Sequence, residues 1–217
     1  MQETPLVQKT AAYIKEMFSG EGSGHDWWHI FRVWQNALYL AREEQANLEV
    51  VQLAALLHDI ADWKFQDNQQ DGGAQAARLW LNEQGAPEDL ILAVTRIIDE
   101  ISYKGAGVAT PMSSPEGRIV QDADRLDAIG AMGIARAFAY GGFKGREMHH
   151  PDIAPEHHAS FEAYKNNNGP TINHFYEKLL LLKDRMNTAA GKKLAEERHR
   201  YMENFLEQFQ REWNINA

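Results

Sequence analysis

The sequence contains no cysteine, and this absence removes several kinds of chemistry. Disulfides, thiolate zinc sites and cysteine nucleophiles all require a thiol. We also find no signal peptide and no apolar run long enough to span a bilayer. Internal repeats, low-complexity regions and strong strand patterns are missing as well. Together these absences predict an all-α protein of the cytoplasm.

Positive charge is scarce in the sequence. Lys and Arg number 22 against 31 Asp and Glu, so the net charge is −9. Nucleic-acid polymers and membrane surfaces attract basic faces, and we therefore expect neither as a partner. A small phosphorylated substrate is compatible with this balance, because it needs only a local basic pocket. The length of 217 residues suits one sizeable domain, which we expect over residues 1–217.

Helical signals recur along the chain. Apolar residues return every three to four positions, which is typical of amphipathic helices. Capping residues, prolines and glycines separate the segments. The stretch 48–62 is the most apolar, so we expect it to be central. The segments expected to be helical are roughly 5–18, 26–45, 48–62, 74–84, 87–101, 115–129, 130–140, 155–165, 171–182 and 189–213.

The segment 53–62 ends in a pattern that core packing does not explain. Its apolar run leads into His58 and Asp59, and Asp62 follows three residues later. Neutral imidazole and carboxylate are suitable metal ligands. The His-Asp pair is nevertheless a weak signal by itself, because a buried His can bond a carbonyl and an Asp can cap or pair with Arg.

Two other expected helices carry side chains of the same kind. His29 lies in one of them. Three acids within six residues interrupt the other: Asp122, Asp124 and Asp127. The four candidate metal ligands are His29, His58, Asp59 and Asp124. Two imidazoles and two carboxylates suit one Mn²⁺, Fe²⁺, Co²⁺ or Ni²⁺ ion, and Zn²⁺ or Mg²⁺ could also bind.

The order of these residues resembles a known family. His29, then His58-Asp59, then Asp124 is similar to the H…HD…D signature of the HD-domain metal-dependent phosphohydrolase superfamily. The local sequences resemble those of small bacterial HD hydrolases at 24–29, 56–64, 122–130 and 173–180. The resemblance covers most of the chain. It implies a helical metal-binding core at about 24–130, with C-terminal helices that complete the pocket and one divalent ion on the four ligands.

The resemblance also implies roles for residues around the metal. Asp62 stands where related nucleotidases carry a carboxylate that handles the proton of the attacking water. Some relatives have Glu there, and the shorter Asp must approach more closely. Lys64 and Arg125 are the candidates for binding substrate phosphates, while Asp122 and Asp127 would support the ligands. The alternatives are a surface acid at a helix end for Asp62 and solvated charges for the two cations.

The subgroup resemblance favours hydrolysis of nucleoside triphosphates to monophosphate and pyrophosphate. The alternatives are a 5′-nucleotidase, another phosphomonoesterase or a phosphodiesterase. A binding module that holds a nucleotide without turnover belongs to a different class, and the intact ligand set with an acid at position 62 favours the enzyme. A further group of histidines could form a second metal site or part of a lid, or could be ordinary loop residues: His149, His150, His157 and His158.

Overall fold

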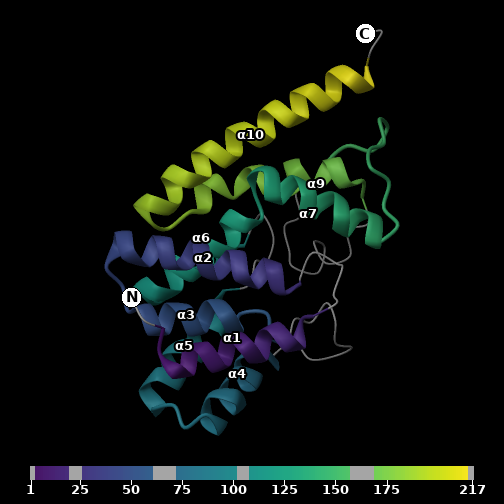
Figure 1. Ribbon diagram of the computed structural model, residues 1–217. Coiled ribbons are helices and arrows are strands. Elements are labelled where there is room, and N and C mark those ends of the chain that lie inside the picture. Colours follow the sequence, from purple (N-terminus) through teal and green to yellow (C-terminus); the bar gives the residue numbers. More distant parts are fainter. Residues whose placement is uncertain (1–2, 20–25, 61–71, 102–107, 157–168, 215–217) are drawn as a thin grey trace. The chain divides into compact units, whose positions relative to one another are not determined.

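The computed structural model describes residues 3–19, 26–60, 72–101, 108–156 and 169–214 (Figure 1). Within these ranges the regular structure is helical and no strand occurs, which confirms the all-α class. The α-helices are α1 (Pro5–Met17), α2 (Trp27–Glu44), α3 (Leu48–Leu57), α4 (Gly72–Glu83), α5 (Glu88–Glu100), α6 (Pro115–Asp127), α7 (Gly130–Phe143), α9 (Thr171–Glu177) and α10 (Ala189–Trp213). Two short 3₁₀ helices follow α9, namely η1 (Leu179–Leu181) and η2 (Lys183–Arg185).

The chain divides into two compact units. The first comprises residues 1–103 and 109–124, and the second comprises residues 104–108 and 125–217. The division falls inside α6, between Asp124 and Arg125. All four candidate metal ligands therefore belong to the first unit. The single domain that we expect from the sequence stays a prediction.

The first unit is built around α3. Asn47 caps this helix, because its side-chain oxygen accepts hydrogen bonds from the N–H groups of Glu49 and Val50. Every residue from 50 to 57 is buried, and α3 packs against α1, α2 and α5. This burial agrees with the central position expected for the most apolar segment. Helix α4 packs against α5 on the outside of this group.

The end of α3 differs from the prediction. The sequence pattern predicts a helix as far as Asp62, but α3 ends at Leu57, and His58 is its C-cap. The N–H of Ile60 donates to the Leu57 carbonyl at 3.1 Å, a bond of the tighter i to i+3 type. Residues Asp62 and Lys64 lie outside the described part of the chain.

The second unit is organised by the long helix α10, which packs against α7 and η2. Helix α7 also contacts α9, and a Cβ at Gly141 would collide with the Thr171 hydroxyl, so only glycine permits this approach. The aromatic rings of Phe138, Phe175 and Phe205 meet between these helices. The sequence predicts one helix over 171–182, but the backbone leaves the helical region at Lys178 and continues as 3₁₀ turns.

No described helix has a stretch that is both long and apolar enough to cross a membrane.

Candidate metal centre

His29 is held at the start of α2. Asp26 is the N-cap of this helix, and its Oδ1 accepts a hydrogen bond from the His29 N–H at 2.9 Å. An N-cap of this kind satisfies one of the free N–H groups of the first turn. The His29 side chain is only 1% exposed. The cap therefore fixes the backbone that carries a buried imidazole.

His58 is oriented by the end of α3. Its Nδ1 lies 2.8 Å from the Ala55 carbonyl oxygen, which has no proton to give, so Nδ1 is the donor. The carbonyl groups of a last helical turn lack partners within the helix, and the imidazole satisfies one of them. The proton on Nδ1 leaves a lone pair on Nε2. A metal-binding histidine needs this arrangement.

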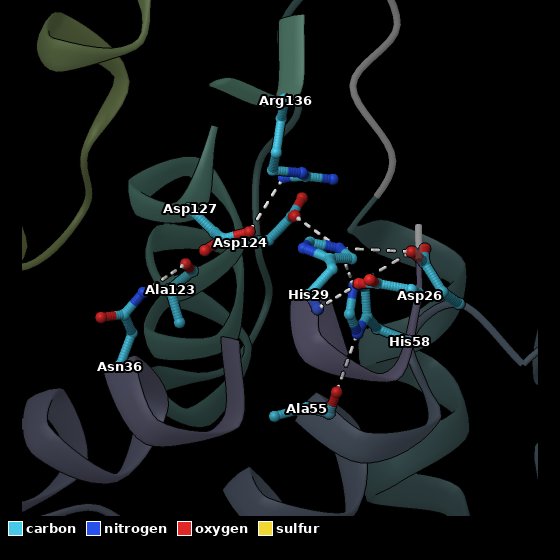
Figure 2. Close-up of polar contacts among 10 residues, drawn as sticks. Asp26, His29, Asn36, Ala55, His58, Ala123, Asp124, Asp127 and Arg136 are labelled. Atoms are coloured by element: carbon cyan, nitrogen blue, oxygen red, sulfur yellow. Dashed lines mark hydrogen bonds and ion pairs between the residues drawn. The ribbon is translucent and has the colours of Figure 1, made fainter. Parts of the chain in front are cut away.

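The donor atoms of the predicted ligands converge (Figure 2). The Nε2 atoms of His29 and His58 are 3.3 Å apart. Asp59 Oδ2 lies 3.4 Å from His29 Nε2 and 3.5 Å from His58 Nε2. Asp124 Oδ1 of α6 lies 3.7 Å from His29 Nε2. Among the described residues, His29, His58 and Asp59 form the group whose ligand atoms all lie within 4.8 Å of one another, and Asp124 adjoins it.

The separations of 3.3 to 3.5 Å among His29, His58 and Asp59 are close to those expected for donors that share an ion. Two donors that are each about 2.1 Å from one cation lie about 3.0 to 3.4 Å apart, depending on the coordination geometry. The chemistry of the donors fits as well, because imidazole nitrogen with carboxylate oxygen suits several divalent metals. His29, His58 and Asp59 therefore form a candidate metal site, with Asp124 beside it.

Burial is uneven across the site. Both imidazoles are buried, whereas the side chains of Asp59 and Asp124 are 18% and 38% exposed. A small molecule could therefore approach from the carboxylate side. Catalytic metal sites keep such an open position, whereas structural metal sites are closed by protein ligands.

Among the described residues, Asp122 and Asp127 are not members of the converging group. Asp122 is fully buried. Asp127 belongs to the second unit, where it pairs with Arg136 through a contact of 3.0 Å. Arg125 is also in the second unit, is buried, and donates a hydrogen bond to the carbonyl of Arg185. Its predicted role in phosphate binding stays a prediction, as do the roles of Asp62 and Lys64.

The additional histidines show no metal-binding group among the described residues. His149 packs against the rings of Phe209 and Trp213, and His150 Nδ1 accepts a hydrogen bond from the Asp152 N–H. His157 and His158 lie outside the described residues.

Sequence reasoning missed three groups that support the site. The first is the Asp26 side chain. Asp26 is an acid at the start of the expected helix, three residues before His29, and an acid in this position is a capping pattern. The second is the Ala55 carbonyl, which no sequence signal marks. The third is Asn36 of α2, whose Nδ2 donates to the Ala123 carbonyl at 3.4 Å, next to Asp124.

Comparison with known proteins places this site in a family. The HD domain model matches residues 27–129, a range that contains all four candidate ligands. The uncharacterized protein YpgQ of Bacillus subtilis is 37% identical over 220 residues, which cover 98% of this chain and 96% of YpgQ. These matches show that the chain belongs to the HD-domain family and is a metal-dependent phosphohydrolase of the HD superfamily.

Solved structures agree with this assignment. A protein from Lactobacillus plantarum has a TM-score of 0.88 and 39% identity, with 100% of both chains covered. An HD-superfamily hydrolase from Bacillus thuringiensis has a TM-score of 0.73 and 45% identity, with 96% of both chains covered. YpgQ in complex with ADP has a TM-score of 0.74 and 34% identity, covering 95% of this chain and 97% of YpgQ.

Proposed function

We propose that this protein hydrolyses nucleoside triphosphates to nucleoside monophosphate and pyrophosphate, using one divalent ion held by His29, His58, Asp59 and Asp124. The convergence of His29, His58 and Asp59, with Asp124 beside them, carries the proposal. The ADP complex of YpgQ supports a nucleotide as the ligand, since that protein covers nearly all of this chain.

The ligand residues prepare the site before any substrate arrives. Ala55 holds the His58 proton on Nδ1, so the Nε2 lone pair is directed toward the cluster. Asp59 and Asp124 bring negative charge that balances a divalent cation. Such a cation, when bound, makes water acidic enough to supply hydroxide near neutral pH and withdraws charge from a phosphoryl oxygen.

The remaining roles come from the sequence motifs. Water adds at the α-phosphorus, the bond to the bridging oxygen breaks, and pyrophosphate leaves. Asp62 would take the proton of that water as the general base. Lys64 and Arg125 would offset the negative charge of the phosphates. In this proposal the metal ligands fix the reaction centre, and these three residues act on the substrate and the water.

A product analysis tests the reaction. Metal-free protein would be loaded in turn with Mn²⁺, Co²⁺, Ni²⁺ or Mg²⁺ and incubated with nucleoside tri-, di- and monophosphates and cyclic nucleotides. We expect pyrophosphate and monophosphate from triphosphates. Orthophosphate from monophosphates would replace the proposal with a nucleotidase. Bound metal without any product would overturn catalysis on nucleotides and favour the binding module.

Three variants test the residue roles. Asp59→Asn should lose both metal and turnover, and Asp124→Asn should bind the metal more weakly and lose turnover, because each removes a charged donor. Asp62→Asn should keep its metal content and lose about 10²- to 10⁴-fold in kcat, the usual contribution of a general base. Asp89→Asn is the control, since Asp89 is an exposed acid of the same unit in the first turn of α5. Full activity in Asp124→Asn would remove that ligand from the proposal.

A further inference from the structure

Asn36 links two of the ligand-bearing helices at a distance from the metal centre. It is half-buried on α2, and its Nδ2 donates to the carbonyl of Ala123 on α6 at 3.4 Å (Figure 2). Ala123 is fully buried and immediately precedes Asp124. The hydrogen bond therefore acts on the peptide group that leads into a candidate ligand.

The position of Asn36 on α2 makes this contact a second constraint on how α6 lies against α2. Asn36 follows His29 by seven residues, which is two helical turns, so both side chains lie on the same face and about 10 Å apart along the axis. His29 meets Asp124 at one point, and Asn36 meets Ala123 at another. Two separated contacts between the same helices restrict both sliding and rotation, whereas one contact restricts mainly distance.

Helix α3 has its own attachment to α2. The buried Trp34 Nε1 donates to Gln52 Oε1 at 3.3 Å, and the apolar faces of these two helices pack together. The spacing of His29 from His58 and Asp59 therefore does not depend on Asn36. A loss of the Asn36 contact should act on Asp124 and leave the other three donors in place.

We infer that Asn36 is a positioning residue that sets Asp124 in the metal site through the Ala123 carbonyl. The inference rests on the proposed metal centre. Metal–ligand distances tolerate changes of only about 0.2 Å, so a small shift of α6 against α2 weakens the Asp124 bond to the ion. Partners outside the ligand shell typically change metal affinity about 10- to 100-fold when they are removed.

A Mn²⁺ titration of the full chain, followed by calorimetry, tests this role. Asn36→Ala should raise the Mn²⁺ dissociation constant about 10-fold. Asn36→Asp keeps the size of the side chain but replaces the donor with an acceptor that faces a carbonyl, so it should weaken binding at least as much. Gln35→Ala is the matched control, because Gln35 is the neighbouring amide of α2 and is exposed. Its dissociation constant should equal that of the unchanged protein.

A double-mutant cycle distinguishes the positioning of Asp124 from a general loosening of the packing between α2 and α6. In an Asp124→Ala background, Asn36→Ala should have no further effect on Mn²⁺ affinity, because the residue it positions is already absent. The inference is overturned if Asn36→Ala and Asn36→Asp bind Mn²⁺ like the unchanged protein, or if the loss persists in the Asp124→Ala background. If the unchanged protein binds no Mn²⁺, Co²⁺ or Ni²⁺, the proposed metal centre itself fails, which is a different result.

Discussion

The Nδ1 of His58 donates to the carbonyl of Ala55, three residues earlier, across 2.8 Å. This bond exists because α3 stops at Leu57, which leaves the carbonyl groups of its last turn without helical partners. The imidazole is thereby fixed with its Nε2 toward His29 Nε2 and Asp59. The end of α3 thus also orients His58 as a metal ligand.

The first prediction concerns the tautomer of His58. In metal-free protein, long-range ¹H–¹⁵N spectra recorded where the imidazole is neutral should show the proton on Nδ1. His199 offers an internal comparison, because its Nε2 faces Glu203 Oε1 at 3.3 Å and should carry the proton. An Nε2-protonated pattern for His58 would contradict the proposed orientation of its lone pair.

The second prediction concerns the cap of α2. Replacing Asp26 with Ala removes the acceptor for the His29 N–H and should lower the free energy of unfolding by about 1 kcal/mol. Serine is also a good N-cap, so Asp26→Ser should retain most of this stability. Urea unfolding of both variants in the presence of a chelator measures the effect. Equal loss in the two variants would show that Asp26 contributes something other than capping.

The sequence predicted three residues whose donor atoms converge in the structure, and it predicted much of the helical framework. His29, His58 and Asp59 converge, as the resemblance of their order to the HD signature implies. Helix α10 runs from Ala189 to Trp213, as its long amphipathic pattern indicates. The burial of α3 also followed from composition, since a helix that is apolar on all sides can only be internal.

Other features depend on contacts that leave no trace in a single sequence. Helix α3 ends at Leu57, where the His58 imidazole bonds the Ala55 carbonyl, whereas the apolar pattern of the sequence continues through Ile60. Helix α9 ends before Lys178, although the sequence has no proline or glycine at that point. Asn36 would have the same sequence signature whether its amide faced solvent or the Ala123 carbonyl. Such cases require tertiary positions and could not be predicted from periodicity.

The third prediction is a pH dependence that involves Glu100. Partial burial raises the pKa of this carboxyl, but hydrogen bonds from the Ser113 N–H and hydroxyl, together with Arg96, outweigh burial and lower the pKa below its ordinary 4.5. A depressed carboxyl pKa stabilises the fold above pH 4.5, and this stabilisation disappears as the pH falls through the lowered value.

Urea unfolding measured from about pH 6 downward into the acid range would measure this effect, because the stabilisation is lost as the carboxylate is protonated. The difference in free energy of unfolding between the unchanged protein and Glu100→Gln should be constant near pH 6 and should decrease as the pH is lowered. Ser113→Ala removes one donor and should move the fall to higher pH. A difference that does not change with pH would show that the Glu100 pKa is not depressed.

The fourth prediction concerns the buried pair of Asp127 and Arg136. Asp127 is 1% exposed, so Arg136→Met would remove the cation that lies 3.0 Å from a buried carboxylate and should cost about 3 kcal/mol. Arg198, on which the Asp127 charge also acts, supplies partial compensation. Adding Asp127→Asn should recover part of the loss, because it removes the charge. Arg96→Met breaks an exposed pair and should cost less than about 1 kcal/mol. Equal losses in Arg136→Met and Arg96→Met would show that burial does not strengthen the Asp127 pair.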